Sequence, residues 1–120
     1  MVSSTAGQVG GLMMTAYCVS KHGLLGLMRA AAQDLAPHGV TCNAVCPGWV
    51  RTPMSEHTAE LEASVQSVTT EEIWRQRDAD SPAGRIVTAE EVAETIAFLA
   101  SAAAGGINGE AVTVSLGSTW

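Results

Sequence analysis

The stretch Val-Thr-Cys-Asn-Ala-Val-Cys-Pro-Gly at residues 40–48 decides the fold class of this chain. Residues 40–46 are mostly apolar and are typical of a short strand buried on both faces, as in a parallel sheet. Pro47 and Gly48 end the strand, because proline lacks an N–H for the ladder and glycine favours a turn. Apolar residues at helical spacing precede the strand over residues 16–36, and this helix stops before Pro37. Its apolar face comprises Leu24, Leu25, Leu27, Met28, Ala31, Ala32 and Leu35.

Further elements are predicted on both sides of this helix–strand pair. In chain order we expect a strand at 1–4, the helix at 16–36, the strand at 40–46, two short polar helices at 55–65 and 71–80, a helix that ends before Gly105, and a strand at 110–114. Thr88 to Glu91 forms a capping box that opens the last helix. Each connection between strands is long enough for a crossover, so the order predicts an α/β fold with a parallel sheet and helices on its faces.

Length and composition exclude several classes of protein. The 120 residues suffice for one small domain, and 47% of them are hydrophobic, which is not typical of a disordered chain. The net charge of −6 gives no basic footprint for nucleic acid and no polybasic membrane patch. No apolar run is long enough to span a bilayer, and no secretory signal is recognisable. The three cysteines form no C-x-x-C, which predicts no metal site and favours reduced thiols in a cytoplasmic protein.

The single tyrosine and the single lysine are spaced so that their side chains could act together in proton transfer. Tyr17 and Lys21 lie four residues apart on one helix and therefore project from the same face. A nearby ammonium group favours a phenolate, so such a tyrosine can exchange a proton with an alcohol. Ser4 ends the first strand, where an active-site residue of an open α/β sheet is expected. By spacing alone, an ordinary exposed helix face is the better explanation of the pair.

Three motifs along the chain resemble the later half of a short-chain dehydrogenase/reductase. They are Ser-Ser-Thr-Ala-Gly at residues 3–7, Tyr-Cys-Val-Ser-Lys-His-Gly at 17–23, and Asn-Ala-Val-Cys-Pro-Gly-Trp-Val-Arg-Thr-Pro-Met at 43–54. In that family a serine stands thirteen residues before the tyrosine of Tyr-x-x-x-Lys, as Ser4 does before Tyr17. A Pro-Gly-x-x-x-Thr segment follows the next strand, as Pro47 to Thr52 does here, and residues 107–112 resemble the last strand.

The resemblance implies the C-terminal half of a Rossmann-type doubly wound sheet, with about three strands and flanking helices. Residues 1–120 would then be a partial domain that holds the catalytic half, and the N-terminal nucleotide-binding half is absent. The glycines of residues 7–11 do not have the G-x-G-x-x-G spacing, and the family's Thr-Gly-x-x-x-Gly-x-Gly and Asn-Asn-Ala-Gly segments are missing. Half a sheet leaves an edge and apolar faces open, so we expect the isolated chain to be poorly stable or to pair through that edge.

One further departure from the family lies near the C-terminus. Residues 115–117 read Ser-Leu-Gly where many members have Asp-Gly-Gly, which affects the expected C-terminal contacts and not the chemistry. Within the family, residues 45–54 and 70–72 are most similar to bacterial β-ketoacyl reductases, polyketide ketoreductases included, and to 3-hydroxyacyl dehydrogenases.

The resemblance assigns the catalytic roles to three residues. Tyr17 would be the general acid/base, and Lys21 would favour its ionised form and hydrogen-bond the nicotinamide ribose. Ser4 would orient and polarise the substrate carbonyl. The alternative for Ser4 is a strand-end hydroxyl that caps a turn. The cofactor would be NAD or NADP, and the substrate a small-molecule ketone or secondary alcohol.

Further residues are assigned to the cofactor and the substrate. Thr52 and the backbone around Val50 would hold the nicotinamide carboxamide, and the backbone of Pro47 and Gly48 would pass close to the cofactor, unless this is only a strand-ending turn. The candidates for the substrate wall are Met13, Met14 and Trp49. A role in the core is an equal alternative for each of these three.

Two segments carry expectations about motion and assembly. Residues 53–80 match the variable substrate lid of the family, with a solvated pair of surface helices as the alternative. The helix at 16–36 resembles one that packs in a subunit interface, which implies a homo-oligomer, although its apolar face is equally explained by the core. The expected activity is an NAD(P)-dependent ketone–alcohol oxidoreductase, possible substrates being a 3-oxoacyl thioester or polyketide. The alternative is a truncated, non-catalytic fragment or assembly partner.

Overall fold

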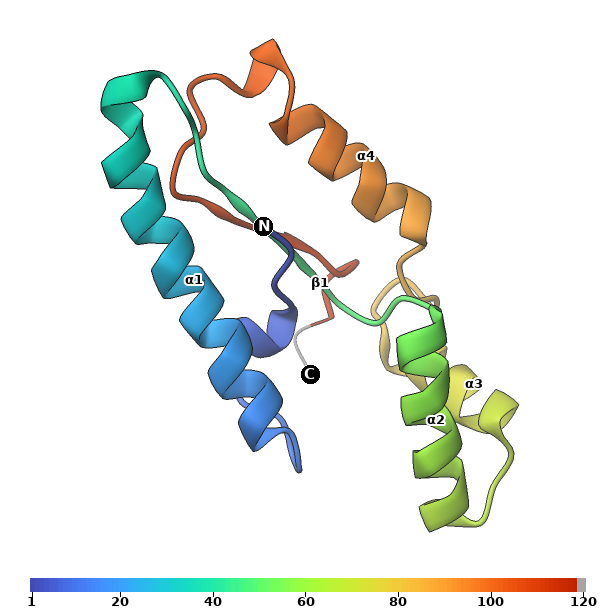
Figure 1. Cartoon of the computed structure of the whole chain (residues 1–120). Coiled ribbons are helices and arrows are strands. Elements are labelled where there is room, and N and C mark those ends of the chain that lie inside the picture. The colour runs from blue at the N-terminus through green and yellow to red at the C-terminus, as the bar shows by residue number, and fades with distance from the viewer. Residues whose placement is uncertain (119–120) are drawn as a thin grey trace.

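The structure is a computed structural model that describes residues 1–118, and Figure 1 shows its helices packed around a small sheet. Its elements in chain order are η1 (Thr5–Gly7), α1 (Thr15–Leu35), η2 (Ala36–His38), β1 (Ala44–Pro47), α2 (Pro53–Gln66), α3 (Thr70–Asp80), α4 (Ala89–Leu99), η3 (Ala102–Ala104) and β2 (Ala111–Val114). The predicted helices are all present, with bounds that differ by a few residues at most. No helix within the described residues is both long and apolar enough to cross a membrane.

The sheet is parallel, as predicted. β1 pairs with β2, with Ala44 opposite Ala111. The expected strand at residues 1–4 is reduced to a parallel bridge between Val2 and Val45, on the other side of β1. Its extended segment is short because Ser4 is already the N-cap of η1, which leaves too few residues for a ladder. The prediction of about three strands is therefore wrong in detail for residues 1–118, which form two strands and two isolated bridges, the second between Val50 and Val87.

The strand predicted at 40–46 begins later, at Ala44. The amide and carbonyl of Cys42 bond to the loop before β2, the amide to Asn108 Oδ1 at 2.8 Å and the carbonyl to the Gly109 amide at 2.9 Å. The side chain of Asn43 donates to the Ile107 carbonyl oxygen at 2.8 Å and accepts from the Glu110 amide at 3.0 Å. Side-chain bonds thus replace the first rungs of the ladder.

Two separate clusters form the core. Leu25 and Met28 of α1 pack against Ala44 and Cys46 of β1. The second cluster joins α2 to α3 and consists of Ala59, Ala63, Ile73 and Trp74. Figure 1 shows the α2–α3 pair on the far side of the sheet from α1, and the chain measures 54 × 27 × 23 Å along its principal axes. Because α2 and α3 have a core of their own, they form a distinct unit beside the sheet.

The apolar faces of α1 and α4 are only partly covered. Leu27 and Leu35, both predicted for the apolar face of α1, are exposed, and no residue of α4 is buried although Phe98 and Ile96 are large and apolar. The expected low stability rests on such open apolar faces. The low stability itself stays a prediction. The subunit interface on α1 also stays a prediction.

Capping boxes fix the starts of three helices. Thr88 and Glu91 make the predicted box at α4. Two more, Thr52 with Ser55 at α2 and Thr69 with Glu72 at α3, were not predicted. The box at Thr52 fixes the first turn of α2, which begins at Pro53 shortly after β1 ends at Pro47.

Candidate active site

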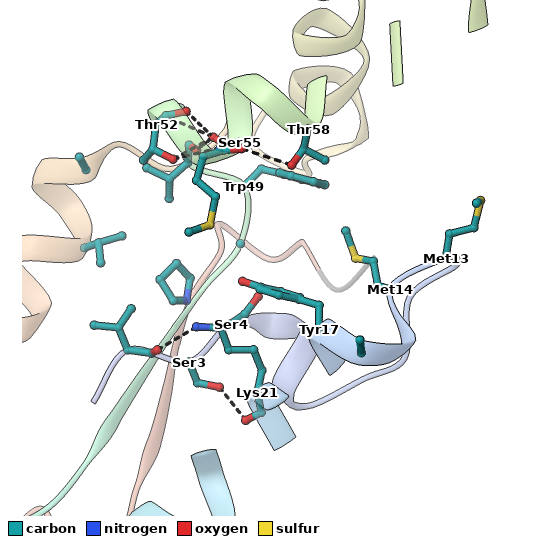
Figure 2. A pocket seen from close by; sticks show the side chains of 18 residues that line it. Ser3, Ser4, Met13, Met14, Tyr17, Lys21, Trp49, Thr52, Ser55 and Thr58 are labelled. Carbon is teal, nitrogen blue, oxygen red and sulfur yellow. Dashed lines mark hydrogen bonds between the residues drawn. The ribbon is translucent and has the colours of Figure 1, made fainter. Parts of the chain in front are cut away.

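A cleft of about 730 Å³ opens where β1 ends, between the start of α1 and the start of α2 (Figure 2). All ten residues predicted for the site line it: Ser4, Met13, Met14, Tyr17, Lys21, Pro47, Gly48, Trp49, Val50 and Thr52. Parallel strands gather the residues that follow them at one edge of the sheet, where open α/β sheets bind their ligands. The structure therefore brings together residues that lie up to 48 positions apart in the sequence.

The start of α1 is held tightly against the end of the first extended segment. A Cβ on Gly7 would lie 2.5 Å from Ser3 Oγ and 2.9 Å from the Lys21 carbonyl oxygen, so only glycine permits this approach of η1 to α1. Ser3 Oγ donates to the same Lys21 carbonyl oxygen at 3.0 Å. These contacts place the helical turn that carries Tyr17 and Lys21 over the end of the strand segment.

Tyr17 and Lys21 form the expected pair. The Lys21 Nζ lies 5.5 Å from the centre of the Tyr17 ring and donates to the Val2 carbonyl oxygen at 3.2 Å. An ammonium group has three N–H donors, so two remain beside the cleft for a ligand. Tyr17 is 39% exposed, and Figure 2 shows its ring in the cleft with the hydroxyl directed toward Ser4.

Ser4 caps a turn and also lines the cleft. It is buried, and its Oγ accepts a hydrogen bond from the Ala6 amide at 3.1 Å, which caps η1. This bond uses a lone pair of the hydroxyl and leaves its O–H hydrogen as a donor. A hydroxyl that caps a turn can thus still donate to an oxygen atom in the cleft.

The segment from Pro47 to Thr52 is fixed by contacts within the protein. A Cβ on Gly48 would meet the Ser115 Cβ at 3.1 Å, so the glycine serves the packing of the two strand ends. The Thr52 hydroxyl accepts from the Ser55 amide at 3.3 Å as the N-cap of α2. Gly48 thus packs against the end of β2 and Thr52 caps α2, and both residues also line the cleft.

The predicted substrate-wall residues differ in burial. Met13 is 95% exposed and has a φ of 58°, so the alternative of a core role is wrong for this residue. Met14 and Trp49 are half-buried. Sequence reasoning missed eight further lining residues: Val2, Ser3, Ala16, Met54, Ser55, Thr58, Ala89 and Val92. Ala89 and Val92 begin α4, and no local sequence signal places that helix beside the cleft.

Cys46, which lies below the cleft in β1, belongs to the core. Burial raises the pKa of its thiol, and hydrogen bonds with Ser3 and Ser4 oppose this rise. A buried thiol with a raised pKa stays protonated and is a poor nucleophile. All three cysteines are free. Within residues 1–118 no cluster of three or more His, Cys, Asp or Glu side chains is arranged to hold a metal.

Comparison with known families matches nearly the whole chain. A short-chain dehydrogenase model, described as enoyl-(acyl carrier protein) reductase, matches residues 1–119. The chain belongs to the short-chain dehydrogenase/reductase family. The resemblance carried by the motifs around Ser4, Tyr17 and Pro47 is thereby confirmed.

Relatives within the short-chain dehydrogenase/reductase family include ketoacyl reductases and hydroxyacyl dehydrogenases. The chain is 43% identical over 113 residues to the monensin polyketide synthase putative ketoacyl reductase of Streptomyces virginiae, and the match covers 94% of this chain and 43% of the relative. It is 40% identical over 116 residues to the (3R)-3-hydroxyacyl-CoA dehydrogenase of Homo sapiens, covering 97% of this chain and 40% of the relative. The chain thus spans less than half the length of these relatives.

A solved structure shares the fold of this family member. A variant of actinorhodin polyketide ketoreductase, crystallised with NADPH, superimposes with a TM-score of 0.92 at 39% sequence identity. The superposition covers 98% of this chain and 45% of that one. The α/β arrangement with a parallel sheet is therefore that of a short-chain dehydrogenase/reductase.

Proposed function

We propose that this chain carries the catalytic half of an NAD(P)-dependent oxidoreductase that interconverts a ketone and a secondary alcohol. The observation that supports this most directly is the convergence of Ser4, Tyr17 and Lys21 on one cleft at the strand ends. The names of the relatives, ketoacyl reductase and hydroxyacyl dehydrogenase, favour a carbonyl over the carbon–carbon double bond that an enoyl reductase would reduce.

Each of the three residues has a distinct task in this proposal. In the direction of reduction, the Tyr17 hydroxyl donates its proton to the carbonyl oxygen as that oxygen becomes an alkoxide. The Ser4 O–H, whose oxygen is anchored by the Ala6 amide, donates a hydrogen bond to the same oxygen and stabilises its developing charge. The Lys21 ammonium, held by the Val2 carbonyl, favours the negative charge left on the Tyr17 oxygen.

The cleft residues fit a nicotinamide group. The cleft is within the usual size range for cofactor sites, and its largely apolar lining carries polar side chains on both sides, among them Lys21 and Thr52 (Figure 2). Two N–H groups of Lys21 are available for a ribose hydroxyl. Thr52 and the backbone at Val50, at the start of α2, are the candidates for the carboxamide. When bound, NAD(P)H supplies the hydride.

The substrate and the assembly belong to the same proposal. Met13, Met14 and Trp49 form an apolar wall suited to the carbon chain of a ketone, and a 3-oxoacyl thioester or polyketide agrees with the names of the relatives. Residues 53–80, which contain α2 and α3, act as the substrate lid. The full-length protein assembles as a homo-oligomer through α1.

The experiment measures NADPH- and NADH-dependent reduction of a 3-oxoacyl thioester, together with binding of both dinucleotides by calorimetry. It uses the 120-residue chain and the longest protein that its gene encodes. Tyr17→Phe keeps the ring and removes the acid, so turnover should fall by about 10²- to 10⁴-fold while circular dichroism stays unchanged. Val19→Ala, an exposed site on the same helix, is the matched control.

Two results would contradict the proposal. Retained turnover in Tyr17→Phe would remove the assigned acid. Absence of dinucleotide binding and of turnover in both proteins would favour the inert fragment or assembly partner. Turnover in the longer protein alone would limit the activity to the full-length context, as the short span of the chain on its relatives leads us to expect.

A further inference from the structure

A buried arginine on α3 stacks on a tryptophan of the cleft wall. The guanidinium carbon of Arg77 lies 3.6 Å from the centre of the Trp49 ring and 4.6 Å from that of Trp74. Its Nη2 donates to Glu62 Oε2 at 2.8 Å, and its Nη1 lies 3.5 Å from the Ser55 carbonyl oxygen. Arg77 thus touches α2, its own helix and the segment that follows β1.

Such a cation is costly to bury. Arg77 is only 6% exposed, and this burial lowers the pKa of its guanidinium, while Glu62 opposes the shift. An apolar side chain would pack between α2 and α3 without this desolvation penalty. A guanidinium offers what an apolar chain lacks, a planar cationic face for an indole and N–H donors at its edge. The stacking of Arg77 on Trp49 therefore indicates that the guanidinium does more than fill space between α2 and α3.

Trp49 connects the Arg77 contact to the cleft. It lines the main cleft and also a second cavity of about 440 Å³, and Arg77 lines only the second one. The indole thus separates the cleft from the guanidinium behind it. Figure 2 shows Trp49 on the opposite side of the cleft from Tyr17 and Ser4. A shift of this indole would alter the space in front of the catalytic groups.

We infer that Arg77 is a positioning residue that holds the Trp49 indole in place as the substrate wall facing Tyr17. Arg77 sits on the α2–α3 unit, so the same contact couples the placement of that unit to the width of the cleft. The consequence for substrate selection rests on the proposed function, whereas the placement of the indole does not.

The test compares Arg77→Lys with wild type in the 120-residue chain by NMR. Lysine keeps the positive charge near Glu62 and removes the planar group, so the Trp49 indole N–H resonance should shift and its heteronuclear NOE should fall. The resonance is assigned with Trp49→Phe. Arg75→Lys is the control, because this neighbour on α3 is exposed and pairs only loosely with Glu72 at 3.8 Å. An unmoved and equally ordered Trp49 indole in Arg77→Lys would overturn the inference.

Ligand selectivity gives the second readout. Dissociation constants for cyclodecanone and decan-2-one are measured from the same indole resonance, and their ratio should change by about threefold or more in Arg77→Lys. A merely structural role would weaken both ketones equally, and an unchanged ratio would overturn the inference. Should wild type bind neither ketone, the consequence for substrate selection fails for this chain, and the indole resonance alone decides whether Arg77 positions Trp49.

A second variant covers the case in which Arg77→Lys does not fold. Trp49→Leu leaves α3 intact and removes the ring beneath the guanidinium, so the Arg77 Nε–H resonance should shift. An unchanged Arg77 resonance in folded Trp49→Leu would overturn the inference.

Discussion

The Lys21 ammonium group donates a hydrogen bond of 3.2 Å to the carbonyl oxygen of Val2, which precedes it by 19 residues. This bond ties the side chain that faces Tyr17 to the extended segment that carries Ser4. The helix alone would leave a lysine free to rotate, since four torsions separate its charge from the backbone. The geometry of the site therefore depends on a contact between α1 and the sheet edge.

Lys21→Met should abolish most of the proposed turnover, because it removes both the charge beside Tyr17 and the bond to Val2. We expect a loss of about 10²- to 10⁴-fold in kcat with a smaller change in stability. Lys21→Arg keeps the charge and should retain more activity than Lys21→Met. Steady-state kinetics of the two variants check the expectation, and equal activities would show that the charge is not used.

Gly7→Ala should destabilise the chain, because the new methyl group would meet Ser3 Oγ and the Lys21 carbonyl oxygen. Overpacking of this kind costs about 1–3 kcal/mol. Gly10→Ala, where no atom lies within 4 Å of the new carbon, is the control and should change stability by less than about 0.5 kcal/mol. Urea denaturation followed by circular dichroism measures both. Equal midpoints would contradict the close approach of η1 to α1.

Met28→Ala should cost far more stability than a change at the next position. Met28 is fully buried against β1, and truncation of such a side chain costs about 2–5 kcal/mol. Leu27→Ala removes an exposed side chain and should cost less than about 0.5 kcal/mol. The comparison of unfolding midpoints tests whether the first core cluster carries the stability of α1. Similar losses at both positions would mean that α1 presents a wider face to a partner in solution.

The pH dependence of stability should include a contribution from Glu91. Bonds from Arg85, and secondarily from the Thr88 amide, lower the pKa of Glu91 from 4.5 to about 2. Because the folded-state pKa is lower than that of the unfolded chain, the stabilisation is complete above pH 4.5 and is lost as the pH falls toward 2.

Glu91→Gln tests this contribution, since glutamine can still cap α4 and cannot pair with Arg85 as an anion. Denaturation between pH 2 and pH 6 should give wild type an advantage over Glu91→Gln that shrinks as the pH falls. Glu90→Gln, at the neighbouring position, is the matched control. A constant difference across this range would exclude the charged pair as its origin.

Local patterns in the sequence predicted most of the secondary structure. Three such patterns are the apolar spacing of residues 16–36, the Thr88–Glu91 box and the strand end at Pro47-Gly48. Each depends on residues within one or two turns of one another, and these interact whatever the tertiary structure is. The boxes at Thr52 and Thr69 carried the same kind of signal, although the first uses Ser55 in place of the usual glutamate or glutamine.

The parallel sheet also followed from the order of elements, because long crossover connections between strands favour parallel pairing over antiparallel pairing. The ends of the strands did not follow in the same way. Ser4 and Asn43 end or replace the ladder through side-chain bonds whose partners become visible only in three dimensions.

By itself, the sequence determined the family through three motifs, and the match to that family predicted ten of the residues that line the cleft. Order along parallel strands then brings the residues that follow the strands together at one edge. Only the tertiary structure decided how that edge is completed. Arg77 stacks on Trp49, and Ala89 lies beside the cleft. These residues are far apart in the sequence, and no helical or strand periodicity links them. Such contacts depend on how α2, α3 and α4 pack, and packing is a property of whole surfaces and not of local sequence.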